Sequence, residues 1–136
     1  MAGKAKIKTH VRTAAKVVGK HVYGNLYGCN PLLLSDEEYL KKVVVEAAVI
    51  GNMTLLNVIS WKFGGGGGVS VVAIVAESHI SIHTWPEYSY ATVDVYTCGE
   101  KCDPERAFHY IVSCLRPKKY TYHFVDRSLK PEDEEY

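Results

Sequence analysis

Two consecutive segments near the middle of the chain alternate between apolar and polar residues, the two-residue period of a β-strand with one buried face. In the first, residues 78–85, one face carries Ile80, Ile82 and Thr84, and the other carries His79, Ser81 and His83. Pro86 ends this segment, and residues 86–89 predict a turn. Residues 91–98 then alternate in the same way, so the pattern predicts a β-hairpin with one apolar and one polar face.

The expected register of this hairpin brings reactive side chains together. A turn centred on residues 87 and 88 pairs His83 with Thr92, His79 with Tyr96, and Ser78 with Thr97. Cross-strand neighbours lie about 5 Å apart, so we expect Ser78 close to Cys98, which shares a face with both histidines. The register therefore predicts a hydroxyl, a thiol and two imidazoles at one end of a sheet.

Hydrophobic spacing predicts further strands on both sides of the hairpin. They are expected at residues 17–27 and 55–63, at 69–76 as an apolar strand that runs into the hairpin, and at 118–125. The glycine run at residues 64–68 predicts a flexible loop. A glycine-rich loop binds phosphate best when a helix follows it, and here a strand follows, so phosphate binding is not favoured.

The sequence predicts the starts of two helices. Ser35 is expected as the N-cap of the first helix, with Glu38 completing a capping box, and Gly51 is expected to end it. Asp103 and Pro104 mark the start of the second. The order β-α-β-β-β-α-β predicts an α+β fold, a two-layer sandwich in which a mostly antiparallel sheet carries two helices on one face.

Length and composition indicate a single globular domain, which we place at residues 17–128, between a flexible basic tail at 1–16 and an acidic tail at 129–136. The net charge of +1 favours neither nucleic acid nor a membrane surface as a partner, although a basic arm can touch nucleic acid. No apolar run is long enough to span a bilayer, and no secretory signal is evident. The four cysteines are therefore interpreted as reduced thiols of a cytoplasmic protein.

The polar cluster of the hairpin is open to several chemical interpretations. A zinc site would draw on His79, His83, Cys98 and Cys102, but histidines four residues apart on a strand are separated by about 13 Å. A hydrolase would pair Ser78 or Cys98 with a histidine base, but no nucleophile elbow is present. The third interpretation is purely structural, with hydrogen-bonded histidines on a half-buried sheet.

Two motifs carry a family resemblance. Residues 77–88 read ESHISIHTWPEY and residues 91–99 read ATVDVYTCG. They resemble the signature of the prokaryotic pyruvoyl-dependent S-adenosylmethionine decarboxylases, a group that includes the archaeal arginine decarboxylases. The resemblance extends in outline over residues 17–128 and is most specific around Ser78.

The resemblance implies a self-cleaving proenzyme. The expected cut lies between Glu77 and Ser78 and gives a β chain of residues 1–77 and an α chain of residues 78–136. Attack of the serine hydroxyl on the preceding carbonyl forms an ester, and β-elimination then leaves a pyruvoyl group at position 78. By position, His83 matches the residue that transfers protons during processing, and Ser70 matches a serine that assists it.

The same resemblance implies the chemistry of the mature enzyme. The pyruvoyl ketone forms a Schiff base with the amine of a small amino-acid substrate and serves as the electron sink for decarboxylation. Cys98 matches the acid that reprotonates the substrate carbon. No metal or diffusible cofactor is required, and a homodimer of cleaved αβ protomers is implied, with the site at or near the interface.

Smaller similarities to the two branches of the family bear on the choice of substrate. Residues 20–27, Phe63 with its glycine loop, and residues 96–100 look more like the arginine branch, whereas residues 85–88 and 51–53 look at least as much like the S-adenosylmethionine branch. Phe63 and Glu77 are candidate substrate-binding residues.

We favour an arginine decarboxylase that makes agmatine for polyamine synthesis. The alternatives are an S-adenosylmethionine decarboxylase that serves spermidine synthesis and a partner subunit that has lost self-processing. The set of Ser78, His83 and Cys98 is intact, which favours an active enzyme.

Overall fold

The computed structural model describes residues 14–134. Its strands are β1 (Gly19–Tyr27), β2 (Leu55–Lys62), β3 (Val69–Val75), β4 (Ser78–Trp85), β5 (Tyr90–Cys98), β6 (Lys119–Tyr120) and β7 (His123–Asp126). Its α-helices are α2 (Pro31–Leu34), α3 (Glu37–Ile50) and α4 (Pro104–Leu115), and two short 3-10 helices lie at Pro86–Tyr88 and Pro131–Glu134.

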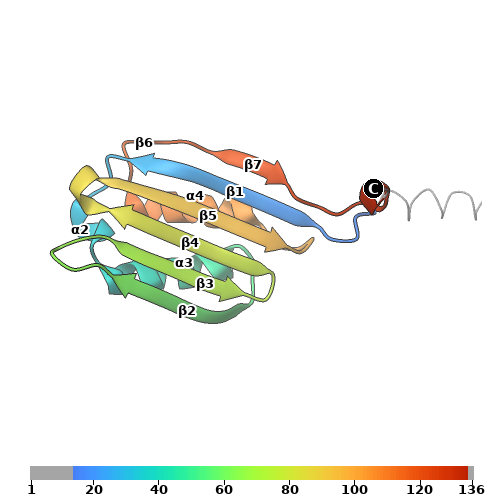
Figure 1. The fold of residues 1–136 in the computed structure, drawn as a ribbon, viewed down its shortest axis with the longest axis horizontal. Helices are drawn as coiled ribbons and strands as arrows, with labels where there is room; N and C mark the ends of the chain where they lie inside the picture. The colour runs from blue at the N-terminus through green and yellow to red at the C-terminus, as the bar shows by residue number, and fades with distance from the viewer. Residues whose placement is uncertain (1–13, 135–136) are drawn as a thin grey trace, which may run out of the picture.

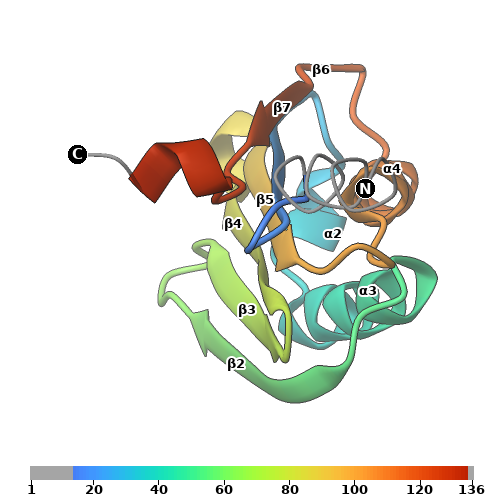
Figure 2. The same cartoon turned by 90° about the vertical axis from the view of Figure 1, so that its right-hand side faces the viewer.

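The strands form one antiparallel sheet in the order β2-β3-β4-β5-β1-β6, and β7 also pairs with β1 (Figure 1). All three α-helices lie on the same face of this sheet, which gives two layers (Figure 2). The predicted α+β sandwich is confirmed, with a short third helix in addition to the two expected.

The hairpin register is the one that the alternation predicts. Between β4 and β5, Ser78 pairs with Thr97, His79 with Tyr96, and His83 with Thr92. The predicted element order was wrong in the middle of the chain, because residues 69–85 make two strands instead of one. Val75 pairs with Ser78, so β3 and β4 form a hairpin whose turn consists only of Ala76 and Glu77.

The first long helix begins one residue later than predicted. Asp36, not Ser35, is the N-cap of α3, and its Oδ1 accepts a hydrogen bond of 3.0 Å from the backbone N–H of Tyr39. Ser35 instead ends the short helix α2, where its hydroxyl donates to the carbonyl of Pro31 at 2.9 Å. The predicted Gly51 terminus of α3 is confirmed.

The second long helix starts as predicted, but the last strand differs. Asp103 is the N-cap of α4, with its Oδ1 accepting from the N–H of Arg106 at 3.0 Å. The predicted strand at 118–125 is split into β6 and β7. Between them, the Oγ1 of Thr121 accepts from the N–H of Asn25 at 2.9 Å, so a side chain takes over part of the sheet pairing.

The core lies between the sheet and the helices. Ile80 and Ile82 of β4, Phe108 and Ile111 of α4 and Leu40 of α3 are fully buried members of one apolar cluster. Each such side chain contributes about 1.5–3 kcal/mol on leaving water. The alternation therefore assigns the buried face of the hairpin correctly.

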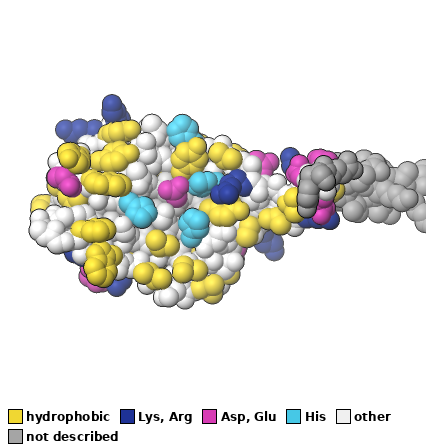
Figure 3. Space-filling view, viewed as in Figure 1, with side chains coloured by type: hydrophobic (Ala, Val, Ile, Leu, Met, Phe, Trp, Pro, Cys, Tyr) yellow, Lys and Arg dark blue, Asp and Glu magenta, His cyan; other side chains and the backbone are white. Residues whose placement is uncertain are grey.

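The other face of the sheet carries no helix and is called the open face below (Figure 3). By register it presents His79 and His83 beside large apolar side chains that remain exposed, namely Ile59 (54%), Trp61 (67%), Ile74 (38%) and Trp85 (39%). Histidine and apolar side chains are both spread over this face in the space-filling view (Figure 3).

The two ends of the described chain meet. Val17 forms a β-bridge with Leu129, and Lys16 forms an ion pair with Glu134. Most of the predicted basic tail at 1–16 and the end of the acidic tail at 129–136 lie outside the described residues. All four cysteines are free thiols. Within residues 14–134, no helix has both the length and the apolar character needed to cross a membrane.

Candidate active site

The Glu77–Ser78 peptide bond lies in the tight turn between β3 and β4. Ser78 has a φ of +147°, a backbone conformation that residues other than glycine rarely adopt. Such a conformation costs about 1–3 kcal/mol and persists only where the surrounding contacts hold it. The bond that the family resemblance marks for cleavage is therefore joined to a strained residue.

Cys98, at the end of β5, contacts both sides of this peptide bond. The Ser78 hydroxyl donates to the Cys98 sulfur at 3.6 Å. The Cys98 thiol donates to the Glu77 carbonyl oxygen at 3.0 Å, and the Cys98 backbone N–H donates to the same oxygen at 2.7 Å. Two donors aimed at one carbonyl oxygen form the arrangement of an oxyanion hole, which stabilises negative charge when a nucleophile attacks the carbonyl carbon.

The carboxylate of Glu77 is held by Thr54, in the loop before β2. Its Oε1 accepts from the Thr54 backbone N–H at 2.9 Å, and its Oε2 accepts from the Thr54 hydroxyl at 3.3 Å. The Thr54 carbonyl accepts from the N–H of Ala76 at 2.8 Å. Sequence reasoning missed Thr54, because no motif links a residue before β2 to the turn after β3.

His83 lies at the opposite end of β4 from Ser78. The five residue steps from position 78 to position 83 span about 17 Å along a strand. The Nδ1 of His83 is 2.8 Å from the hydroxyl of Ser70, with which it shares a hydrogen bond. The prediction that both imidazoles gather with Ser78 and Cys98 at one end of the sheet was therefore wrong for His83, although the predicted register was right.

His79 is the imidazole that stays near Ser78. Its ring packs against Tyr96, with the ring centres 5.8 Å apart. Burial lowers the pKa of His79, and the nearby His21 and Arg127 add to this effect, while Asp94 opposes it. His79 is therefore a neutral ring near physiological pH. The Nε2 of His21 makes a 2.9 Å hydrogen bond to the Asp94 carboxylate on the same face.

A cavity of about 380 Å³ opens beside His83, and it is called the His83 cavity below. Phe63, the predicted substrate-binding residue, lines it together with Ser70, His83, Trp85, Glu87 and the glycine loop. A Cβ at Gly68 would lie 1.9 Å from the Thr84 carbonyl oxygen, so no side chain fits at this part of the wall. Sequence reasoning did not assign Trp85 or Glu87 to a substrate site.

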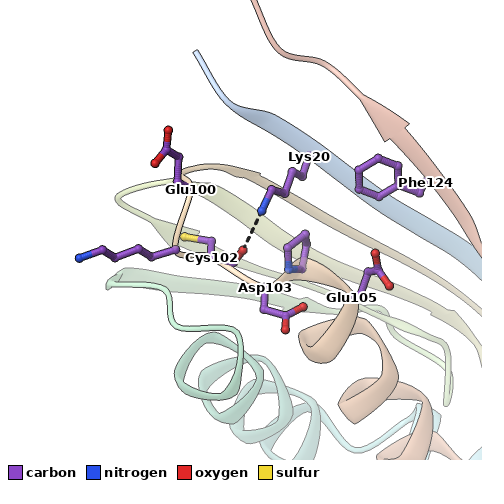
Figure 4. A pocket seen from close by; sticks show the side chains of 8 residues that line it. Lys20, Glu100, Cys102, Asp103, Glu105 and Phe124 are labelled. Atoms are coloured by element: carbon purple, nitrogen blue, oxygen red, sulfur yellow. Dashed lines mark hydrogen bonds between the residues drawn. The ribbon is translucent and has the colours of Figure 1, made fainter. Parts of the chain in front are cut away.

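A second cavity of about 450 Å³ lies on the helix side, beside the start of α4 (Figure 4). Its charged lining is mixed: the carboxylates of Glu100, Asp103 and Glu105 are balanced in part by Lys20, whose Nζ donates to the Cys102 carbonyl at 3.3 Å. Neither Ser78 nor His83 lines it. Within the described part of the chain, no group of three or more potential metal ligands is brought together.

Fold and site together indicate an enzyme with a serine–cysteine centre, and the comparisons identify its class. The model of the S-adenosylmethionine decarboxylase family matches residues 20–128. The chain therefore belongs to the S-adenosylmethionine decarboxylase family. The resemblance seen in the sequence is confirmed, and decarboxylation takes the place of the hydrolase alternative.

Individual relatives carry two names. The chain is 62% identical over 116 residues to an arginine decarboxylase proenzyme of Hyperthermus butylicus, a match that covers 85% of this chain and 82% of that one. It is 60% identical to an S-adenosylmethionine decarboxylase proenzyme of Pyrobaculum islandicum, covering 88% and 95% of the two chains. The crystal structure of the adenosylmethionine decarboxylase from Aquifex aeolicus is similar, with a TM-score of 0.78 at 35% identity, covering 90% of this chain and all of that one.

Proposed function

We propose that this protein is a cytoplasmic arginine decarboxylase proenzyme with one catalytic domain at residues 17–128. It cuts itself between Glu77 and Ser78, and the mature enzyme converts arginine to agmatine and carbon dioxide for polyamine synthesis. The observation that carries the proposal is the Ser78 hydroxyl at the strained turn, beside a carbonyl held by two donors from Cys98. The name of the Hyperthermus relative supports arginine as the substrate.

Self-cleavage follows from the chain's own groups. The Ser78 Oγ attacks the carbonyl carbon of Glu77, the carbon–nitrogen bond breaks, and the hydroxyl proton ends on the Ser78 nitrogen, which leaves an ester. The Cys98 N–H and thiol stabilise the oxyanion of this step. Loss of the Ser78 α-proton then breaks the Cβ–O bond and releases Glu77 as a carboxylate. Water replaces the nitrogen of the remaining dehydroalanine, ammonia leaves, and a pyruvoyl group remains at position 78.

The site fits such a group. Its ketone supplies the electron sink that loss of carbon dioxide from an amino acid requires. The Cys98 thiol, 3.6 Å from the Ser78 Oγ, is positioned to hold the proton that the substrate carbon takes up after carbon dioxide leaves. The reaction as proposed uses no metal.

Ser70 and His83 supply the proton transfers of self-cleavage from a second copy of the chain. Within one chain, His83 and its β3 partner Ser70 lie at the far end of the sheet from Ser78 and cannot reach it. The open face also exposes Trp61, Ile59 and Trp85, where a soluble protein is expected to cover them. Two copies can pack open face to open face about a two-fold axis that lies between the sheets, parallel to them and perpendicular to β4. This packing brings the His83 end of one copy over the Ser78 end of the other. This arrangement is a homodimer of cleaved protomers.

The same packing aims the His83 cavity at the partner's residue 78. Phe63 and Trp85 are flat surfaces on which a guanidinium stacks, and the Glu87 carboxylate matches its forked donors. Glu77, the other candidate, is already hydrogen-bonded to Thr54 and is not needed for binding. The second candidate substrate is S-adenosylmethionine, which the name of the Pyrobaculum relative and the stacking surfaces for an adenine ring favour.

A denaturing intact-mass spectrum tests the cleavage. We expect two chains split after Glu77, the downstream one lighter by one ammonia than a chain that begins with serine. Ser78→Ala is expected to stay whole and inactive. A whole wild-type chain after long incubation, or decarboxylation by the Ser78→Ala variant, refutes the proposal.

Release of labelled carbon dioxide from carboxyl-labelled arginine and from S-adenosylmethionine then tests the substrate. Glu87→Gln is expected to weaken arginine turnover by at least about tenfold, because a neutral amide replaces the ionic partner of the guanidinium. Turnover of S-adenosylmethionine alone favours the second candidate.

A further inference from the structure

Thr54 makes three contacts to the two residues before the proposed cut, and these contacts are called the Thr54 clamp. Its backbone N–H and hydroxyl donate to the two carboxylate oxygens of Glu77, at 2.9 and 3.3 Å. Its carbonyl accepts from the N–H of Ala76 at 2.8 Å. One residue of the preceding loop thus grips both residues of the turn through main chain and side chain.

The clamp and Cys98 hold Glu77 from different directions. Thr54 holds the carboxylate, and the Cys98 N–H holds the carbonyl oxygen at 2.7 Å. With both ends of Glu77 held, its carbonyl carbon has little freedom to turn away from the Ser78 hydroxyl. The two holds also maintain the positive φ of Ser78, which a loose two-residue turn would relax.

We propose that Thr54 is a positioning residue for self-cleavage, acting through the carboxylate of Glu77. The inference rests on the proposed function, since it concerns the rate at which the Glu77–Ser78 bond is cut. A displacement of about 1 Å between reacting groups costs about 100-fold in rate. The contribution of the clamp is therefore measurable in the cleavage rate even where folding is unaffected.

Thr54 and Glu77 both belong to the upstream chain, so cleavage does not separate them. The clamp therefore keeps the new chain end of Glu77 beside residue 78 after the cut. Glu77 thus acts as a structural group of the site. Its carboxylate receives hydrogen bonds from Thr54 and needs no partner from the substrate.

The test follows the cleavage rate of newly made protein in a cell-free translation pulse-chase. Thr54→Val keeps the size and the backbone contacts but removes the hydroxyl, and we expect about tenfold slower cleavage, the effect of one lost hydrogen bond to a charged group. Thr54→Ser is expected to restore the wild-type rate. Glu77→Leu removes the acceptor of both donors, and we expect about 100-fold slower cleavage, with no further loss in the double variant with Thr54→Val.

Thr121→Val is the matched control, because it removes a hydrogen-bonded threonine hydroxyl at the far edge of the sheet. It is expected to cleave at the wild-type rate. Melting temperatures measured in the uncleavable Ser78→Ala background separate positioning from folding, and we expect Thr54→Val to leave them unchanged.

A Thr54→Val chain that cleaves at the wild-type rate while Ser78→Ala stays whole overturns the role of Thr54 and leaves the proposed function standing. Strictly additive effects of Thr54→Val and Glu77→Leu overturn the route through the carboxylate. A wild-type chain that is never cut overturns both proposals.

Discussion

Two inactive variants should restore self-cleavage to each other when they share a dimer. In the Ser78→Ala chain the nucleophile is missing, but Ser70 and His83 are intact. In the His83→Ala chain the nucleophile Ser78 is intact, but the imidazole that transfers the protons is missing. If the site is built from two copies, a mixed dimer contains one complete site, made of Ser78 from the His83→Ala chain and His83 from the Ser78→Ala chain.

The expected size of the effect comes from the position of His83 on β4. Five strand residues place its ring about 17 Å from Ser78 within one chain, whereas proton transfer requires contact at about 3 Å. Removing a positioned acid or base slows a reaction by about 100- to 10,000-fold. Each variant alone should therefore stay largely whole, and the mixed dimer should cut at close to the wild-type rate.

The assay is co-expression of the two variants with different affinity tags, followed by purification through both tags and intact-mass analysis. Only the His83→Ala chain should be cut, because only that chain retains Ser78. A mixed dimer in which neither chain is cut, or a His83→Ala chain that cuts itself when expressed alone, would refute the two-copy site. Co-expression of two differently tagged Ser78→Ala chains serves as the control, and neither chain should be cut.

Three further predictions concern the surroundings of Ser78. Cys98→Ala should lower decarboxylation by at least about 100-fold through loss of the proton donor, while cleavage slows but persists because the backbone N–H remains; product release and cleaved fraction measure the two effects. Thr97 is fully buried and its Oγ1 has no hydrogen-bond partner among the described residues, so Thr97→Val in the Ser78→Ala background should raise the free energy of unfolding by about 1 kcal/mol in urea titrations. Burial lowers the pKa of His79, so the folded chain binds this proton more weakly than the unfolded chain. Its contribution to stability is then complete above about pH 6.5 and is lost as the pH falls, and His79→Asn should flatten the decline of unfolding free energy between about pH 7 and pH 5.

The sequence predicts that Ser78 and Cys98 lie side by side. The separation of His83 from this pair was predictable only in part. Alternation and the Pro86 turn determine the register of β4 and β5, and that register alone places Ser78 beside Cys98. The same register, combined with the rise of a strand, already separates His83 from Ser78. The error lay in treating residues on one face as residues at one end.

The remaining errors have local physical causes. Pro31 and the Asn30 cap start a short helix that uses Ser35 as its end, so the N-cap of α3 moves to Asp36. The hairpin of β3 and β4 has a two-residue turn without glycine or asparagine, and hence without the usual sequence signal. The contact between Thr54 and Glu77 spans the β2–β3 hairpin, and no residue pattern encodes it.

The place of the proposed cut within the sheet determines what keeps the mature protein assembled. Cleavage after Glu77 leaves β1, β2 and β3 on one piece and β4 to β7 on the other, yet β1 lies between β5 and β6 and β3 pairs with β4. The two pieces interleave and cannot part without breaking the sheet. Once unfolded, they must find each other again as separate molecules, without the turn that first joined β3 to β4. If the chain is cut there, the proenzyme folds as one chain, whereas the mature enzyme depends on slow unfolding to stay assembled.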